Sequence, residues 1–153
     1  MIIVRKLEPC EMQIITKLYR YNDAEAAINE NCRMVTSGTA DIFCIFDGEN
    51  PFGELRVKYR SDNELYTSAG KRVYLYAFRI NKEYRGRGYG KLLIGSVIDE
   101  LEKRGYSEFT IGVSNDNARA KHIYRDLGFT EPISVVTEEY RGDKYSYTLY
   151  LKS

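Results

Sequence analysis

The sequence is poor in the residues and patterns that mark several classes of protein. Its three cysteines, Cys10, Cys32 and Cys44, are odd in number and form no Cys-x-x-Cys pair. This favours a reducing compartment and argues against disulfides or a zinc site. Lysines and arginines number 23 against 22 aspartates and glutamates, so the charge gives no case for binding nucleic acid or a membrane surface. No apolar run approaches the length of a membrane span. We therefore expect a cytoplasmic protein that binds no metal, nucleic acid or membrane.

Length and the first residues limit the architecture further. A chain of 153 residues suits one domain and is too short for two comfortable ones, so we expect a single domain over residues 1–153. The segment Met1–Lys6 lacks the long apolar region and the cleavage site of a signal peptide, and it is expected to form a short strand. The sequence contains no low-complexity segment and no internal repeat.

Apolar periodicity and turn signals predict an alternation of strands and helices. Residues 8–21 are expected to be helical because Met12, Ile15 and Leu18 recur at three-residue steps. Asp23 is a candidate cap for a second short helix within residues 23–30, whereas residues 31–40 carry mixed signals and residues 61–71 read as a polar loop. Strands are expected at 2–6, 41–46, 52–59, 73–80, 108–113, 133–137 and 144–151, with further helices at 89–104 and 117–127. This order predicts an α+β fold in three layers, a central mixed sheet flanked by helices.

A glycine-rich turn between the strand at 73–80 and the helix at 89–104 is the most informative feature. It reads Arg85-Gly86-Arg87-Gly88-Tyr89-Gly90. Glycine tolerates the backbone angles that such a turn needs. The first N–H groups of the following helix have no partner inside it, and the helix dipole adds positive potential there. With two flanking arginines, the turn predicts a pocket for a phosphate-bearing ligand.

Two familiar phosphate loops do not fit this turn. A P-loop needs a glycine where Arg85 stands and a serine or threonine where Leu92 stands. A dinucleotide fingerprint counted from Gly86 finds its third glycine one residue early, at Gly90. The turn therefore belongs to another kind of phosphate site.

The pattern Arg-x-x-Gly-x-Gly, read at Arg85, Gly88 and Gly90, resembles the pyrophosphate-binding loop of the GNAT superfamily of N-acetyltransferases. In that superfamily the loop holds the diphosphate of acetyl-coenzyme A (acetyl-CoA). The preceding strand usually ends in an aliphatic residue five positions before the arginine, and Ile80 occupies that position. The order of the expected elements from residue 1 to residue 151 is also similar to that of the superfamily.

A second segment, residues 117–129, resembles the second coenzyme-binding element of the same superfamily. The asparagine of that element, its alanine three residues on and its tyrosine seven residues on match Asn117, Ala120 and Tyr124. Seven residues make nearly two helical turns, so Asn117 and Tyr124 share one helix face with Ala120 between them. Gly128 suits the left-handed position that ends a helix, and Phe129 is then expected to return to the core.

The resemblance implies a GNAT-like domain that binds acetyl-CoA as co-substrate, without a metal, and transfers its acetyl group to an amine by direct attack. It implies that Tyr124 protonates the departing thiolate and that a backbone N–H of the strand at 78–80 stabilises the oxyanion. The same strand edge would bind the pantetheine amides, and Asn117 would steady the split beside that strand or contact the coenzyme arm. The coenzyme-binding residues that the resemblance implies are Phe78, Ile80, Arg85, Gly86, Arg87, Gly88, Tyr89, Gly90, Asn117 and Tyr124.

The general base stays open. Many members of the superfamily carry a glutamate on the strand before the glycine-rich turn, where this sequence has Tyr74, which cannot readily act as a base at neutral pH. Glu54 and Glu64 are substitutes, although each is expected to be a solvated surface charge. A chain of water molecules or an amine that arrives neutral are the alternatives. The one histidine, His122, lies about 140° round its helix from the implied coenzyme face and is expected to face solvent or serve the structure.

Two classes of function follow. The first is an N-acetyltransferase that acts on a primary amine of a small molecule or a protein. The second, suggested by the absent glutamate, is a non-catalytic acyl-CoA-binding sensor or regulatory module. Succinyl-CoA is an alternative donor. The acceptor stays open because acceptor loops differ freely within one fold, and so does the choice between monomer and homodimer.

Overall fold

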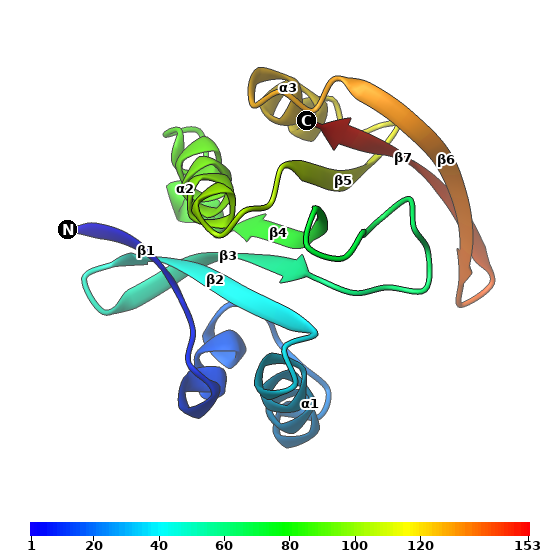
Figure 1. Cartoon of the computed structure of the whole chain (residues 1–153). Coiled ribbons are helices and arrows are strands. Elements are labelled where there is room, and N and C mark those ends of the chain that lie inside the picture. The colour runs from blue at the N-terminus through cyan, green and yellow to red at the C-terminus, as the bar shows by residue number, and fades with distance from the viewer.

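The computed structural model describes residues 1–153 apart from the side chain of residue 140. Within these residues seven strands form one mixed sheet in the order β1-β2-β3-β4-β5-β7-β6 (Figure 1), which confirms the expected α+β fold and every expected strand. The strands are β1 Ile2–Lys6, β2 Ala40–Asp47, β3 Asn50–Lys58, β4 Arg72–Ile80, β5 Glu108–Ser114, β6 Glu131–Tyr140 and β7 Asp143–Lys152. The helices are α1 Ala24–Thr36, α2 Tyr89–Lys103 and α3 Ala118–Asp126, with 3₁₀ helices η1 Pro9–Lys17 and η2 Lys82–Tyr84.

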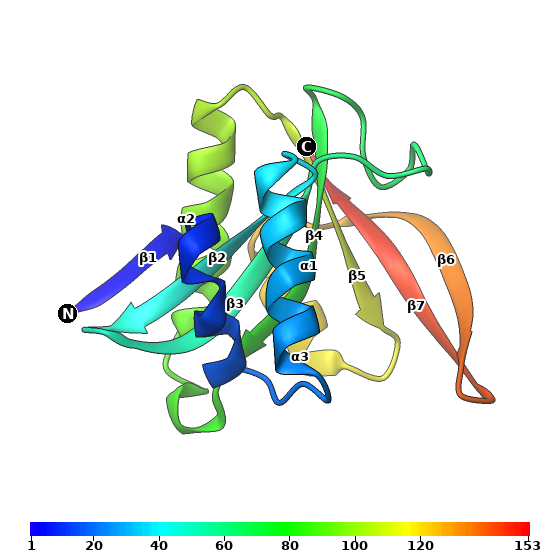
Figure 2. The same cartoon turned by 90° about the horizontal axis from the view of Figure 1, so that it is seen from below.

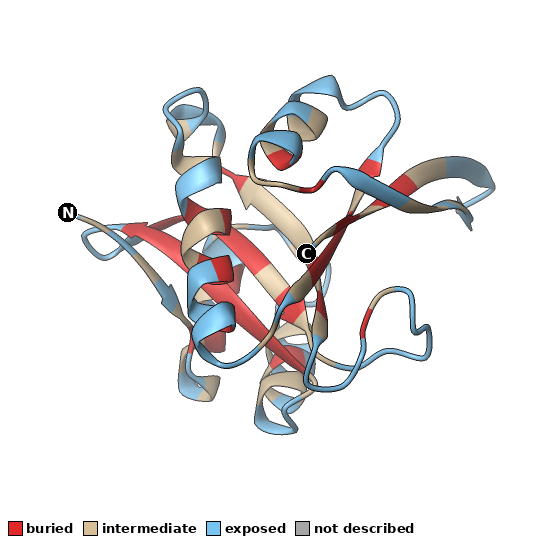
Figure 3. Cartoon of the chain, turned by 45° about the horizontal axis from the view of Figure 1, so that its top comes forward, coloured by how far each residue is buried: buried red, intermediate tan, exposed pale blue. Residues whose placement is uncertain are grey.

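Helices cover both faces of the sheet. Figures 1 and 2 show α2 and α3 on one face and η1 and α1 on the other. Side chains alternate between the faces along each strand, and Leu55 and Leu75 share a core with Leu93 of α2. On the opposite face, Ile42 shares a second core with Met12 of η1. Burial of each large aliphatic side chain contributes roughly 1.5–3 kcal/mol, and Figure 3 shows this burial concentrated on the central strands.

The last turn of α3 sets the direction in which the chain leaves the helix. Gly128 adopts a φ of +100°, which glycine reaches without steric cost. The N–H of Phe129 donates to the carbonyl of Tyr124 at 3.0 Å, the long bond of a Schellman motif. Phe129 is 2% exposed, so the predicted return of the chain to the core is confirmed.

The first two helices differ from the expected ones. The segment expected to be helical at 8–21 is a 3₁₀ helix that ends at Lys17. Its apolar repeat explains this, because a 3₁₀ helix has three residues per turn and places Met12 and Ile15 on one buried side. The next helix, α1, continues to Thr36. The polar Asn31 interrupts the sequence pattern of this helix. It is buried and accepts a hydrogen bond from Arg56 of β3 at 2.7 Å.

Strands β4 and β5 separate halfway along their length. They pair in parallel between Arg72–Leu75 and Glu108–Ile111, and within the described residues the rest of β4 pairs with β3 alone. In this second half Ala77 has a φ of +53°, which is uncommon outside glycine. The β3–β4 register shifts between Glu54 and Arg56, as in a β-bulge. An unpaired strand edge and a bulge therefore lie side by side.

Candidate active site

A groove of about 730 Å³ lies where the second half of β4 meets the start of α2 and one face of α3. Its volume falls within the range of roughly 300–1,000 Å³ that small-molecule and cofactor sites occupy. Its lining residues come from the end of β4, from the glycine-rich turn at 85–90 and from α3. Two sequence motifs about thirty residues apart thus form one site.

The glycine-rich turn closes one end of the groove with backbone groups. Gly86 and Gly88 have φ values of +78° and +84°, which suit glycine. Gly88 is the N-cap of α2, and no side chain of the described residues caps this helix end. The first N–H groups of α2 are therefore available to an anion. Arg85 anchors the turn to β4, because its Nε donates to the carbonyl of Ile80 at 2.8 Å.

An ionic contact joins α2 and α3 beside the groove. The Nζ of Lys91 and the Nε2 of His122 lie 2.6 and 3.4 Å from the same Oδ2 of Asp126. The hydrogen bond from Lys91 lowers the pKa of Asp126. The side chain of His122 is 73% exposed and faces solvent as expected, but it also lines the groove, so its expected place away from the coenzyme face is wrong. Exposed pairs of this kind add little to stability, and the effect of this one is to join the two helices beside the groove.

Asn117 begins α3 as its N-cap. Its Oδ1 accepts a hydrogen bond from the N–H of Ala120 at 3.1 Å, a contact that typically contributes about 1 kcal/mol to a helix. Both residues line the groove. The roles of Asn117 at the strand split and toward the coenzyme stay predictions.

Tyr124 lies at the buried end of the groove. The residue is 6% exposed, and its ring meets that of Phe78 of β4 edge to face, with centroids 6.2 Å apart. Burial raises the pKa of Tyr124 to about 12. The phenol therefore keeps its proton at neutral pH, and it can donate that proton but cannot act as a base.

Glu54 is not the solvated surface charge that the sequence suggested. It is 0% exposed, and its carboxylate oxygens face the Nε atoms of Arg79 at 2.9 Å and Arg56 at 3.4 Å. An amine cannot reach either oxygen without displacing an arginine. Burial raises the pKa of Tyr74, so this residue cannot act as a base at neutral pH either, as expected.

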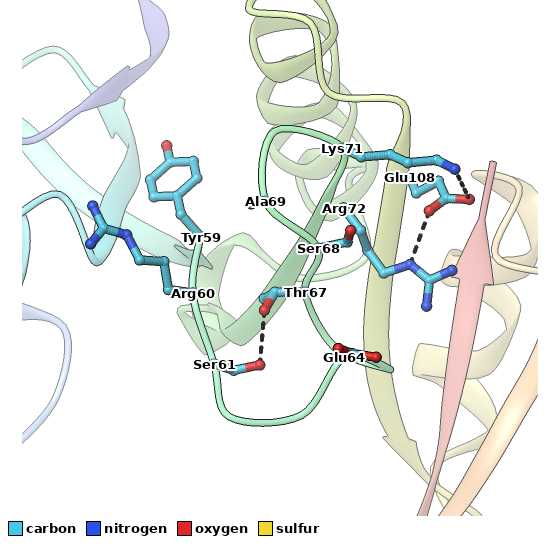
Figure 4. A pocket seen from close by; sticks show the side chains of 10 residues that line it. All are labelled: Tyr59, Arg60, Ser61, Glu64, Thr67, Ser68, Ala69, Lys71, Arg72 and Glu108. Atoms are coloured by element: carbon cyan, nitrogen blue, oxygen red, sulfur yellow. Dashed lines mark hydrogen bonds and ion pairs between the residues drawn. The ribbon is translucent and has the colours of Figure 1, made fainter.

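Glu64 is exposed, as expected, and lies on the loop at 61–71. Figure 4 shows it beside a second cavity, of about 560 Å³, which this loop encloses and which shares no lining residue with the groove. Polar side chains that line this cavity bond to one another. The hydroxyls of Ser61 and Thr67 lie 2.9 Å apart, and the Nε of Arg72 donates to Glu108 at 3.1 Å. Glu64 is therefore not part of the groove.

Nine of the ten residues implied to bind the coenzyme line the groove: Phe78, Ile80, Arg85, Gly86, Gly88, Tyr89, Gly90, Asn117 and Tyr124. Arg87 does not line it, because its guanidinium lies over the ring of Tyr84, 5.7 Å from the centroid. The groove is also lined by residues that were not predicted to bind the coenzyme: Arg79, Tyr84, Lys91, Arg119, Ala120, His122 and Ile123. Helical spacing could have predicted this for α3, because residues 119, 122 and 123 recur at three- and four-residue steps and so share one helix face.

Among the residues that the structure describes, no group of three or more His, Cys, Asp or Glu side chains could hold a metal ion. No helix of that part of the chain is long and apolar enough to cross a membrane.

The chain belongs to the acetyltransferase (GNAT) family. The profile of that family matches residues 6–129, a range that contains the bulged β4, the glycine-rich turn and α3. Tyr124 and Asn117 both lie within the matched range. The resemblance carried by two short motifs is thus confirmed at the level of the family.

Sequence relatives match shorter stretches. The chain is 39% identical over 57 residues to the ribosomal protein bS18-alanine N-acetyltransferase of Escherichia coli (strain K12), covering 37% of this chain and 38% of that protein. It is 32% identical over 79 residues to the thialysine N-epsilon-acetyltransferase of Sus scrofa, covering 51% of this chain and 46% of that protein. The matches thus span less than half of either relative.

Solved structures align over nearly the whole chain. A chimera of the spermidine N-acetyltransferase SpeG from Vibrio cholerae with hSSAT aligns with a TM-score of 0.78 at 17% identity, covering 99% of this chain and 94% of that one. The putative acetyltransferase yncA from Salmonella typhimurium, solved with its cofactor acetyl-CoA, gives a TM-score of 0.74 at 17% identity, with 98% and 92% covered. At such identities the likeness shows the fold.

Proposed function

We propose that this chain is an acetyl-CoA-dependent N-acetyltransferase that passes the acetyl group directly to an amine. The observation that supports this best is one groove that runs from the glycine-rich turn to the phenol of Tyr124, along the unpaired half of β4. Membership of the GNAT family points the same way, and the relatives named above are N-acetyltransferases.

The donor set of the groove fits coenzyme A. Its diphosphate is an anion, and the start of α2 offers free N–H groups flanked by Lys91 and Arg119. The pantetheine arm carries amides that can pair with the unpaired edge of β4 as an added strand would. The small side chain of Ala120 leaves space for that arm beside α3. When bound, acetyl-CoA supplies an acetyl group activated as a thioester.

Two groups of the chain act on the reacting atoms in this proposal. Ala77 and Phe78 have no partner residue in the β3–β4 register, and a backbone N–H of this bulged segment stabilises the oxyanion that forms during attack. Tyr124 donates its phenolic proton to the sulfur as the C–S bond breaks. Its raised pKa, about 12 through burial, keeps that proton in place until then.

The attacking amine gives its proton to water in this proposal. Among the described residues no carboxylate side chain lines the groove, and Glu54 is shielded by two arginines. His122 lines the groove, but its Nε2 faces Asp126 at 3.4 Å. We therefore assign the proton to solvent.

The test combines binding with turnover. We expect calorimetry to detect acetyl-CoA binding without added metal, and we expect primary amines to trigger release of free thiol. Binding without thiol release from any amine would instead support the non-catalytic sensor. A protein that does not bind acetyl-CoA would refute both functions. Competition with succinyl-CoA then tests the choice of donor.

A further inference from the structure

Arg79 stands beside the proposed reaction centre but has no part in the mechanism above. It follows the bulge at Ala77 by two residues and lies opposite Glu54 of β3. Its side chain contacts Glu54 and Tyr19, which places it on the sheet face that η1 and α1 cover (Figure 2). This face is opposite the one that carries α2 and α3, although Arg79, as part of β4, also contributes to the wall of the coenzyme groove.

The side chain of Arg79 contacts two neighbouring side chains. Its Nε lies 2.9 Å from the fully buried carboxylate of Glu54, and its Cζ lies 4.4 Å from the centroid of the Tyr19 ring. Within the described residues no hydrogen bond uses its two terminal nitrogens, and the side chain is 30% exposed. A guanidinium that forms an ion pair through Nε and lies over an aromatic ring can present its two terminal nitrogens as a fork to a carboxylate.

The other arginine that pairs with Glu54 is Arg56, and both of its terminal nitrogens donate hydrogen bonds within the fold. Arg56 Nη1 donates to Asn31 at 2.7 Å, and its Nη2 donates to the hydroxyl of Tyr21 at 3.0 Å. Burial disfavours its charge, but Glu54, Tyr21 and Tyr76 together outweigh this effect and raise the pKa of Arg56. Arg56 thus supports the fold, and Arg79 is left as the cation that can meet a ligand.

The charge and shape of this face favour an anionic acceptor with an apolar body. Three positive charges, from Arg56, Lys58 and Arg79, lie on this face against two carboxylates, that of Glu54 and that of Glu138 near Tyr74. Beside them the rings of Tyr74 and Tyr76 stack with centroids 5.5 Å apart. Such a surface repels a polycation, whereas a carboxylate and an apolar side chain both find partners on it.

We propose that Arg79 binds the carboxylate of the acceptor, and that the acceptor is an α-amino acid whose apolar or aromatic side chain packs on Tyr74 and Tyr76. The proposal rests on the proposed function. A strand rises about 3.3 Å per residue, so Arg79 lies about 7 Å from Ala77. A carboxylate bound to the guanidinium, with its α-amine directed to the bulge, occupies that interval. The α-amine then reaches the acetyl group from the face opposite the coenzyme groove.

The test uses four amines that separate the carboxylate from the rest of the acceptor: L-phenylalanine, L-phenylalaninamide, 2-phenylethylamine and spermidine. We expect the intact protein to acetylate L-phenylalanine with the highest kcat/KM of the four. The double variant Arg79→Met/Glu54→Gln removes both partners of the Arg79–Glu54 pair, and Arg56 keeps its hydrogen bonds to Asn31 and Tyr21. It should lower kcat/KM for L-phenylalanine roughly 10- to 100-fold, as loss of a charge-assisted pair predicts. Its kcat/KM for L-phenylalaninamide should change less than about twofold, because no carboxylate is present.

A matched control and a second readout keep the test decisive. Arg72→Met/Glu108→Gln removes another arginine–glutamate pair from β4, outside the groove, and should leave the preference for L-phenylalanine intact. Arg79→Lys keeps the charge and loses the fork, so an intermediate loss is expected. Calorimetry with N-acetyl-L-phenylalanine and its amide reports on the same contact without turnover. The acid should bind more tightly to the intact protein, and the two should bind equally to the Arg79→Met/Glu54→Gln variant.

The outcomes separate this inference from the proposed function. A protein that releases thiol with spermidine or 2-phenylethylamine in preference to L-phenylalanine would overturn the inference while upholding acetyl transfer. An equal loss toward acid and amide in the Arg79 variant would also overturn it. Thiol release from none of the amines would count against the proposed function, and calorimetry would then decide whether Arg79 is a carboxylate site.

Discussion

Tyr124 combines three properties that a proton donor needs. Its hydroxyl is kept protonated because burial raises its pKa to about 12. Its ring is fixed by edge contacts with Phe78 and Phe129, both with centroids 6.2 Å away. It lies at the end of the groove that the glycine-rich turn begins. In the proposed reaction the hydroxyl of Tyr124 is therefore needed for turnover but not for coenzyme binding.

Tyr124→Phe keeps the ring and removes that hydroxyl. We expect kcat to fall about 100-fold, the lower end of the range for general acid catalysis, because a thiolate is already a moderate leaving group. Affinity for acetyl-CoA should stay unchanged, as for a contact made chiefly in the transition state. Steady-state turnover and calorimetry measure the two effects, and Tyr106→Phe, outside the groove, is the control. Wild-type turnover at saturating donor and acceptor would end the acid role.

Arg85 and Arg119 are expected to support coenzyme binding in different ways. Arg85 is tied to the carbonyl of Ile80, so Arg85→Ala should weaken acetyl-CoA binding roughly tenfold, about 1.4 kcal/mol, by loosening the turn. That loss should persist at high salt. Arg119 is an exposed cation on the groove, and the loss in Arg119→Ala should shrink as salt screens its charge. Calorimetry at low and high salt compares them. A loss in Arg85→Ala that vanishes at high salt would show that Arg85 acts by charge alone.

At the scale of elements, β5 depends on a glycine that admits an aromatic ring. A Cβ built on Gly112 would lie 2.8 and 3.0 Å from two ring carbons of Tyr147 on β7, whereas one built on Gly95 of α2 meets nothing within 4 Å. Gly112→Ala should therefore destabilise the fold by about 1–3 kcal/mol through overpacking. Gly95→Ala should stabilise it by up to about 1 kcal/mol through helix propensity. Urea unfolding of both variants measures the difference, and a shift of the same sign in both would contradict this account.

The elements that carry the coenzyme motifs could be predicted from the sequence because their signals are local. Glycine spacing gave the turn and the end of α3, and seven-residue spacing gave the shared face of Asn117 and Tyr124. The bulge could not be predicted, because Ala77 gives no sign of a positive φ. Glu54 was expected at the surface because its burial depends on the β3–β4 register that brings it opposite Arg79. Such pairing joins distant residues and leaves no local pattern.

At the scale of the whole molecule, several buried groups hold their protons more tightly in the fold than in the unfolded chain. Burial raises the pKa of Cys44 and of Tyr124 to about 12 in each case, and it also raises the pKa values of Tyr59 and Tyr74. All four groups are neutral when protonated. Their ordinary pKa values are about 8.5 for cysteine and 10 for tyrosine, so their contribution to stability is complete below about pH 8.5.

This contribution should be lost as the pH rises from about 8.5 toward 12, because the unfolded chain releases these protons first. Each group weakens folding by about 1.4 kcal/mol for every pH unit between its unfolded and folded pKa values. Urea unfolding should therefore show a lower midpoint at pH 10.5 than at pH 8. Tyr124→Phe should flatten the pH dependence above about pH 10. A midpoint that stays constant to pH 11 would contradict the account.

The separation of β4 from β5 has a kinetic consequence. In the proposed reaction the two substrates bind from opposite faces of the sheet and meet only at the gap between β4 and β5. Neither substrate blocks the path of the other, so both occupy the protein together before the acetyl group moves. Initial-rate lines measured at several fixed acceptor concentrations should then intersect instead of running parallel. Free coenzyme A should compete with acetyl-CoA for its site and should not block binding of the amine.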